Sequence, residues 1–190
     1  MDFAFFYKKN IKYCQKNIMK KIGIIGGGIS GLYLANILNN NPNFDYQVFE
    51  RKSNFNFSEG YGIQLSVNSI KLLNKLNFNN LSASEFYFPT KVNFFNSNNP
   101  KKICDINLSQ FNDDQTRYTT TKRSTLLKFL LENIPKEKIK FKVTLTHVEE
   151  GENIKVYFSD NSQEYFDFLI IADGIFSQSK STILNKSFSP

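Results

Sequence analysis

The sequence contains no tryptophan, only two cysteines and a single histidine among 190 residues. Cys14 and Cys104 lie far apart and form neither a Cys-x-x-Cys motif nor a metal-ligand spacing, which excludes a disulfide scaffold and predicts a reducing cytoplasmic location. His147 has no cysteine or acidic partner at ligand spacing, so we expect no metal site. A chain of this length buries about 70% of its unfolded surface and needs no such staple.

Long apolar runs and a widespread excess of charge are also absent. The apolar segment 3–7 is too short for a signal-peptide core or a membrane span, so we expect no membrane contact. The net charge is +7, but residues 1–21 hold six lysines and one aspartate, whereas the rest of the chain holds 18 basic and 16 acidic residues. Most of the charge therefore lies in residues 1–21, which include a basic N-terminal extension, residues 1–18, and it does not predict a nucleic-acid partner. That extension is either a read-through before Met19 or a basic arm for an acidic partner.

A strand, a glycine-rich turn, a helix and a second strand follow one another after the extension. Residues 21–25 are typical of a buried parallel strand, residues 29–38 have apolar side chains at helical spacing, and residues 46–50 form the next strand. These segments predict one right-handed βαβ unit, and residues 168–172 predict another buried strand. The expected fold class is therefore α/β, with a Rossmann-like βαβ domain.

The turn in this unit carries a nucleotide-binding pattern. Residues 26–31 read Gly-Gly-Gly-Ile-Ser-Gly and match Gly-x-Gly-x-x-Gly between a strand and a helix. In this pattern Gly26 permits the tight turn, Gly28 lets a pyrophosphate approach the backbone, and Gly31 lets helix and strand pack closely. The alternative is a glycine-rich turn that binds no ligand.

Residues on either side of the turn fit a dinucleotide. The helix that opens at Ile29 and Ser30 offers amide groups and a positive dipole end to phosphates. Glu50, 19 residues after Gly31, is expected to accept hydrogen bonds from ribose hydroxyls, which disfavours a 2′-phosphate and therefore NADP as the resident cofactor. The alternative is a solvated carboxylate. Arg51 either lies along the adenosine half or is solvated, and the motif alone does not distinguish NAD from FAD.

Two later positions fit a ligand at the same sheet. Arg123 opens a helix, where a cation interacts poorly with the dipole, so an anionic ligand nearby explains it better than packing does. Asp173 and Gly174 follow the buried strand 168–172, at the edge where α/β proteins bind ligands. An exposed arginine and an ordinary turn are the alternatives.

The remaining segments predict further elements in outline. We expect an extended piece at 62–66, helices at 68–76 and 124–134, strands at 86–95, 102–108, 140–148 and 154–158, and a polar loop at 109–121. Aromatic residues are mainly core, although some within 86–118 are candidates for a substrate pocket.

Several segments together resemble the flavoprotein aromatic hydroxylases, the family of para-hydroxybenzoate and salicylate hydroxylases. Besides the glycine motif and the Val-Phe-Glu-Arg strand end at 48–51, the resemblance is carried by residues 60–68, 123–126 and 167–177. In the family the first of these three segments runs beneath the flavin, and the second supplies an arginine to the ribityl and phosphate region of the flavin. The third serves both FAD and reduced nicotinamide. The resemblance therefore implies FAD-binding roles for Arg123, Asp173 and Gly174.

The family's activity is also implied by this resemblance. FAD is bound, NAD(P)H is a transient reductant, and a flavin hydroperoxide hydroxylates an aromatic or related small molecule. The chemistry belongs to the cofactor, so we nominate no catalytic side chain. The implied domains are a first FAD-binding part (19–85), a partial antiparallel substrate-domain sheet (86–121) and a second FAD-binding part (122–190).

The resemblance covers residues 20–180 but only about half of a family member, so we expect a truncated chain. The family's later Gly-Asp segment and the rest of its substrate sheet have no counterpart in the sequence. An FAD-dependent monooxygenase would then need a complementing C-terminal half, so whether this chain is itself an enzyme is left open. The alternatives are a non-catalytic or split-gene dinucleotide-binding fragment, and a basic-arm interaction protein on a Rossmann scaffold.

Overall fold

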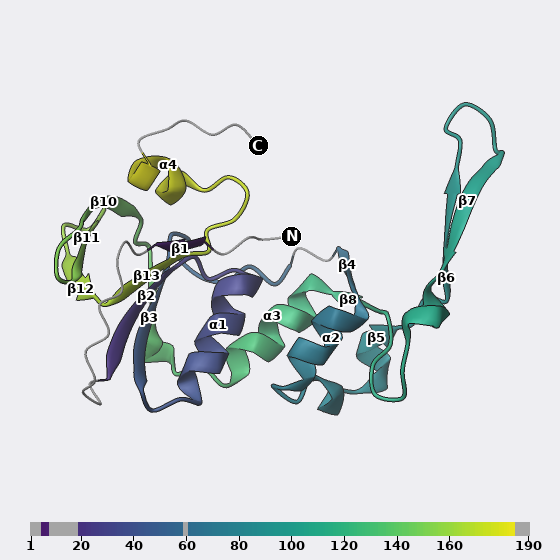
Figure 1. Cartoon of the computed structure of the whole chain (residues 1–190), viewed down its shortest axis with the longest axis horizontal. Helices are drawn as coiled ribbons and strands as arrows, with labels where there is room; N and C mark the ends of the chain where they lie inside the picture. The colour runs from purple at the N-terminus through teal and green to yellow at the C-terminus, as the bar shows by residue number, and fades with distance from the viewer. Residues whose placement is uncertain (1–4, 8–18, 59–60, 185–190) are drawn as a thin grey trace. The chain divides into compact units, whose positions relative to one another are not determined.

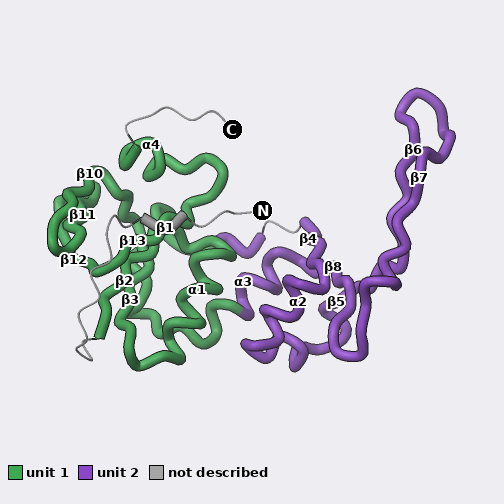
Figure 2. Tube along the Cα trace, viewed as in Figure 1, with its two compact units in different colours: residues 1–55, 130–190 green, residues 56–129 purple. Residues whose placement is uncertain are grey.

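The computed structural model describes residues 5–7, 19–58 and 61–184 (Figure 1). Apart from residues 5–7, the predicted basic extension lies outside the described residues. The chain forms two compact units, unit 1 from residues 1–55 and 130–190 and unit 2 from residues 56–129 (Figure 2). The domain boundaries given by the resemblance stay a prediction.

A five-stranded sheet lies at the centre of unit 1, in the order β1-β13-β2-β3-β9. Its parallel strands are β2 (Lys20–Ile25), β3 (Phe44–Glu50), β9 (Ile139–Phe141) and β13 (Phe168–Ile171). Strand β1 (Phe5–Tyr7) adds an antiparallel edge to β13. The apolar runs in β2 and β13 suit central strands covered on both faces, and the predicted α/β class is confirmed.

Helix α1 (Ile29–Asn39) covers one face of this sheet (Figure 1). Ile24 and Val48 point to that face and are fully buried, as are Leu32 and Ala35 of the helix. The buried amide of Asn36 donates hydrogen bonds to the carbonyls of Leu32 and, at 2.6 Å, Leu130. The predicted helix at 29–38 is therefore present, and its apolar stripe packs on the sheet.

A three-stranded antiparallel sheet covers the other face. It contains β10 (Leu145–Glu149), β11 (Ile154–Phe158) and β12 (Gln163–Phe166), in that order. The Phe49 ring stacks on Phe158 at 4.2 Å between centroids and meets the edge of Phe166 at 5.8 Å. Unit 1 is thus a layered structure of helix, parallel sheet and antiparallel sheet, with its core on both faces of the central sheet.

The single strand expected at 140–148 is two strands in different sheets. Strand β9 ends at Phe141, Lys142 adopts a left-handed φ of 60°, and β10 begins at Leu145. The Lys142 amide donates to Lys52 O, which ties the bend to the loop after β3. Alternating side chains continue through the bend, so the sequence pattern alone gave no break. Strand β12 and helix α4 (Gln178–Leu184) were also not predicted.

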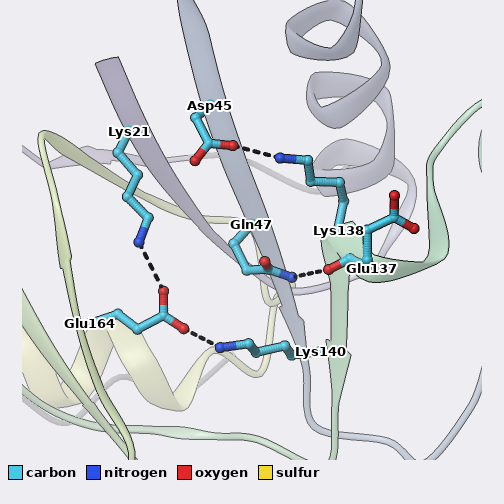
Figure 3. A network of polar contacts seen from close by, with 7 residues as sticks. All are labelled: Lys21, Asp45, Gln47, Glu137, Lys138, Lys140 and Glu164. Carbon is cyan, nitrogen blue, oxygen red and sulfur yellow. Dashed lines mark hydrogen bonds and ion pairs between the residues drawn. The ribbon is translucent and has the colours of Figure 1, made fainter. Parts of the chain in front are cut away.

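Ion pairs and hydrogen bonds bind the strands of unit 1 to one another (Figure 3). Glu164 on β12 accepts from Lys21 on β2 at 3.2 Å and also from Lys140 on β9. Burial opposes ionisation of Glu164, but the hydrogen bonds from Lys140 and Lys21 outweigh it and hold the pKa of this carboxyl below its usual range. Lys138 donates to Asp45 at 2.6 Å. The network joins segments more than a hundred residues apart in sequence.

Unit 2 is built on a small antiparallel sheet, β4 (Gly62–Leu65), β8 (Thr119–Lys122) and β5 (Phe86–Tyr87). Strand β8 falls at the end of the predicted loop 109–121, which was therefore wrong at that end. Its buried β-branched Thr119 and Thr121 suit a strand despite their polarity, because the Thr121 hydroxyl donates to Glu85 O at 2.9 Å.

The other elements of this unit are helices and a hairpin. The helices are α2 (Val67–Asn74), the start of α3 (Arg123–Glu132), and short 3₁₀ turns η1 (Phe78–Asn80), η2 (Ala83–Glu85) and η3 (Leu108–Phe111); a fourth turn, η4 (Lys136–Lys138), belongs to unit 1. Phe78 is buried against the ring edge of Phe129 at 5.0 Å. These contacts form a second, smaller core.

The hairpin pairs β6 (Lys91–Phe95) with β7 (Lys102–Asn107). The predicted strand 86–95 is broken between β5 and β6, where Pro89 provides no backbone donor. Hydrogen bonds from Lys102 and Lys91 lower the pKa of Asp105 to about 2. One face of the hairpin thus carries paired charges.

Candidate functional site

The glycine turn lies at the carboxyl end of β2, as the motif predicts. Gly26 has a φ of 108°, and a β-carbon at this position would lie 2.4 Å from Ala172 O. A β-carbon on Gly31 would lie 2.0 Å from Gly26 O. The first position therefore needs glycine both for its backbone angle and for its closeness to the strand end, and Gly31 needs it because the helix lies against the turn.

Gly28 differs from these two glycines. Its φ of −77° is accessible to any residue, and a β-carbon there would meet only Ala172 O, at 4.0 Å. The fold itself thus has no need of glycine at position 28. Open space above this backbone is what a pyrophosphate requires for close approach.

The amino terminus of α1 begins directly at this open position. Gly28 is the N-cap residue and provides no side-chain cap, and the first helical hydrogen bond runs from the Leu32 amide to Gly28 O at 2.9 Å. Ile29 and Ser30 are the first helical residues, half-buried, and the first turn carries no acidic side chain. The positive end of the helix dipole is therefore not neutralised by an acidic residue of its own turn.

Glu50 ends β3 and holds the glycine turn. Its Oε2 accepts a hydrogen bond from the Gly27 amide at 2.9 Å, and its Oε1 accepts one from the Lys52 amide at 2.9 Å. A carboxylate has about four acceptor sites, so each oxygen retains capacity for a ligand hydroxyl. Arg51 follows as an exposed residue. Glu50 is thus anchored at the turn, a contact that sequence reasoning did not predict.

Asp173 lies just beyond β13 and carries an orphaned acceptor. Its Oδ2 accepts from the Ser179 amide at 3.2 Å, but its Oδ1 is buried and has no hydrogen-bond partner among the described residues. Such an atom costs about 1–3 kcal/mol unless it is satisfied. Gly174 follows with a φ of 88°. A ligand hydroxyl donating to Oδ1 would remove that cost, which fits a polyhydroxylated cofactor.

Arg123 is the one predicted cofactor residue that belongs to unit 2. It is the first residue of α3, its amide donates to Tyr61 O at 3.1 Å, and its guanidinium lies 5.9 Å from the Tyr61 ring centre. The remaining predicted residues, Gly26, Gly28, Ile29, Ser30, Gly31, Glu50, Arg51, Asp173 and Gly174, all lie in unit 1.

Phe55 is a residue of this site that sequence reasoning missed. A β-carbon on Gly27 would lie 2.9 Å from Phe55 Cε1 and 3.1 Å from Glu50 Oε2. The ring also meets Phe141 edge to face, with centroids 5.1 Å apart. The available signal was an aromatic side chain five residues after Glu50, in a mostly polar loop that also holds Phe57.

A pocket of about 320 Å³ lies in unit 2. Phe78, Phe86 and Phe88 form much of its apolar wall, and Arg117 and Asp114 lie on its polar side. The Arg117 guanidinium is 5.9 Å from the Phe88 ring centre. Two aromatic residues from the expected segment 86–118 therefore do line a cavity.

In residues 5–7, 19–58 and 61–184, no group of three or more potential ligands could hold a metal ion. Within the same ranges, no helix is long and apolar enough to cross a membrane.

Known proteins match the chain at this site and beyond it. The model of an NAD(P)-binding Rossmann-like domain matches residues 24–56, the segment that contains the glycine turn and Glu50. The 6-methylsalicylate 1-monooxygenase of Aspergillus terreus is 29% identical over 87% of this chain and 40% of its own length. Salicylate hydroxylase of Pseudomonas putida is 26% identical over 86% of this chain and 38% of its own length.

Solved structures show the same fold. A salicylate hydroxylase substrate complex has a TM-score of 0.70 at 18% identity and covers 92% of this chain and 41% of its own. HpxO of Klebsiella pneumoniae, complexed with FAD and uric acid, has a TM-score of 0.64 at 22% identity, over 79% of this chain and 38% of its own. The chain thus spans about 40% of the length of the curated relatives it matches. The glycine turn, the strand order and the sequence likeness thus agree: the chain is similar to part of several FAD-dependent monooxygenases and aromatic hydroxylases.

Proposed function

We propose that the chain is the FAD-binding portion of an NAD(P)H-dependent flavoprotein monooxygenase that hydroxylates an aromatic or related small molecule. The observation that carries the proposal is the pairing of open backbone at Gly28 with the orphaned acceptor Asp173 Oδ1 at one edge of the sheet. The first accommodates a pyrophosphate and the second a hydroxyl donor. The likeness to FAD-dependent monooxygenases supports a flavin as the group that has both.

Six of the predicted residues then have a defined role toward the ligand. Gly28 and the amides at Ile29 and Ser30 receive the pyrophosphate, while the spare lone pairs of Glu50 accept from the ribose. Asp173 accepts a hydroxyl hydrogen bond at Oδ1, and Arg123 of unit 2 is assigned to the phosphate and ribityl region by the resemblance alone. When bound, FAD would supply the redox chemistry, with NAD(P)H as the reductant and oxygen as the oxidant. The task of the chain is to bind, orient and shield that cofactor.

Catalysis requires further polypeptide, because exclusion of water is part of the protein's contribution. We propose that a complementing C-terminal half supplies it, since the matched relatives are about two and a half times longer than the aligned segment. The same observation favours the second candidate, a non-catalytic or split-gene fragment that binds the dinucleotide without turnover. Cys14 and Cys104 lie far apart in sequence and form no recognisable motif, which supports a cytoplasmic location for both candidates.

Titration of the full chain with FAD, followed by flavin fluorescence and absorption, tests cofactor binding. Gly28→Val should weaken binding by at least about tenfold, because its side chain blocks the approach of the phosphates. Glu50→Ala should weaken it less. Glu164→Gln, which changes the paired network of Figure 3, is the matched control and should bind normally. Unchanged affinity in Gly28→Val would remove the glycine turn as the pyrophosphate site.

NADH oxidation separates the two candidates once FAD is bound. A monooxygenase portion should oxidise NADH in the presence of an aromatic substrate when its complementing half is co-expressed, with hydroxylated product detected by mass spectrometry. A non-catalytic fragment should retain FAD and oxidise no NADH under any of these conditions.

A further inference from the structure

The side chain of Phe55 lies against the same backbone position as the Glu50 carboxylate. A β-carbon on Gly27 would lie 2.9 Å from Phe55 Cε1, 3.1 Å from Phe55 Cζ and 3.1 Å from Glu50 Oε2. The atoms nearest the turn are therefore on the edge of the ring. Phe55 is half-buried, so the ring is held at the turn without being sealed inside the core.

The position of this ring is fixed by its surroundings. Phe141 meets it at a 75° interplanar angle and is the register partner of Glu50 across strands β3 and β9. The loop that leads to Phe55 is tied at Lys52, whose amide donates to Glu50 Oε1 and whose carbonyl accepts from the Lys142 amide. A ring held this way loses little additional freedom when a ligand stacks on it.

We infer that Phe55 is the base-stacking residue of this site, receiving the adenine of an adenosine diphosphate group beside Glu50. The inference rests on the proposed function, in which Glu50 accepts from the ribose. One glycosidic bond joins the ribose to its base, so a ribose at Glu50 brings the base to the residues packed around that carboxylate. Phe55 is the aromatic ring in contact with that position. Every base offers a planar face for such stacking.

This assignment makes the site selective for a class of ligand. FAD and ADP carry the adenosine that Phe55 would contact, whereas FMN ends at its phosphate. Loss of the ring should therefore weaken FAD and ADP binding and leave FMN binding unaffected. A residue that only supported the fold would affect all three ligands alike.

The absence of tryptophan from the sequence permits a direct test. Phe55→Trp introduces a single tryptophan, whose emission should be quenched saturably by ADP and not by ribose 5-phosphate, which has no base. Phe57→Trp, two residues further along, is the matched control and should respond to neither ligand. ADP binding by calorimetry with no change in Phe55→Trp emission would overturn the assignment.

Affinity measurements on the full chain complete the test. Phe55→Leu keeps apolar bulk against Phe141 and should bind FAD and ADP about tenfold more weakly with FMN unchanged, whereas Phe55→Tyr should bind all three normally. Equal weakening of FAD and FMN would make Phe55 a support of the fold and overturn the inference. Normal FAD binding by Phe55→Leu would overturn it too, while the proposed function stands. A wild-type chain that binds neither FAD nor ADP would refute both.

Discussion

The two ends of the parallel sheet in unit 1 are built on opposite principles. At the amino ends, charges meet in pairs: Lys20 contacts Asp167 at 2.7 Å and Lys138 contacts Asp45 at 2.6 Å. At the carboxyl ends lie the glycine turn, the open backbone at Gly28 and the buried Asp173 Oδ1, which has no partner in the part of the chain that the structure describes. The same sheet therefore has paired charges at the amino ends of its strands and an unsatisfied hydrogen-bond acceptor at their carboxyl ends.

The comparison separates residues that stabilise the fold from residues that would bind a ligand. The ion pairs at the amino ends of the strands contribute to the stability of the fold and not to ligand binding. Because they are partly exposed, each contributes little. The open edge lowers stability by leaving an acceptor unsatisfied, which a ligand can recover on binding. Substitutions at the two edges should accordingly separate into effects on folding and effects on affinity, with one exception.

Gly31 is that exception and should give the largest effect. Gly31→Ala places a β-carbon 2.0 Å from Gly26 O, so the helix must move away from the turn. We expect a loss of about 3 kcal/mol or more in the free energy of unfolding, measured by urea denaturation. Gly28→Ala is the control, because its β-carbon meets only Ala172 O, at 4.0 Å, and it should cost less than about 1 kcal/mol. Equal losses in the two variants would contradict the division between these glycines.

Glu164→Gln should give an intermediate effect that depends on pH. The lysines hold the folded-state pKa of Glu164 below its unfolded value, so this carboxylate stabilises the fold above the unfolded pKa and the contribution is lost as pH falls through the folded pKa. At pH 7 the variant should be about 1 kcal/mol less stable. The gap to wild type should narrow as the pH falls below the unfolded pKa of a glutamate, about 4.3. Denaturation at pH 7 and pH 3 measures this, and a gap of the same size at both values would point to packing.

Lys138→Ala should give the smallest effect. The pair with Asp45 is about one-third exposed on both sides, so its loss should change stability by about 0.5 kcal/mol or less. FAD affinity should not change, because the pair lies at the opposite end of the sheet from the glycine turn. Any measurable loss of FAD binding in Lys138→Ala would contradict the separation between stabilising residues at the amino ends of the strands and binding residues at their carboxyl ends.

The parts of the site that are continuous in sequence were predictable. The turn at 26–31, the strand before it and the helix after it are local, so spacing alone indicated the steric demands on Gly26 and Gly31. Strand β13 was equally predictable from the sequence, because a run of apolar residues before Asp-Gly has few interpretations other than a buried strand. The layered α/β architecture follows from these segments.

Contacts between distant segments were not predictable from the pattern. The bend at Lys142 depends on a bond to the loop after β3, and the Thr121 hydroxyl of β8 finds its acceptor, Glu85 O, in a distant segment. The Glu50 bond to the Gly27 amide joins residues 23 apart, and the orphaned oxygen of Asp173 is defined only by its three-dimensional surroundings. Periodicity reports which side chains are buried and does not report which acceptor a given amide finds.

The pairing of β2 with β13 also constrains how the site is assembled in time. Ile25 and its register partner Ile171 are separated by nearly the whole described chain, with unit 2 encoded between them. Contacts of such sequence separation form slowly, because the intervening chain must first be ordered or looped out. During synthesis the glycine turn would therefore be made well before Asp173. The ligand site at the carboxyl ends of the strands becomes complete only when β13 has paired with β2.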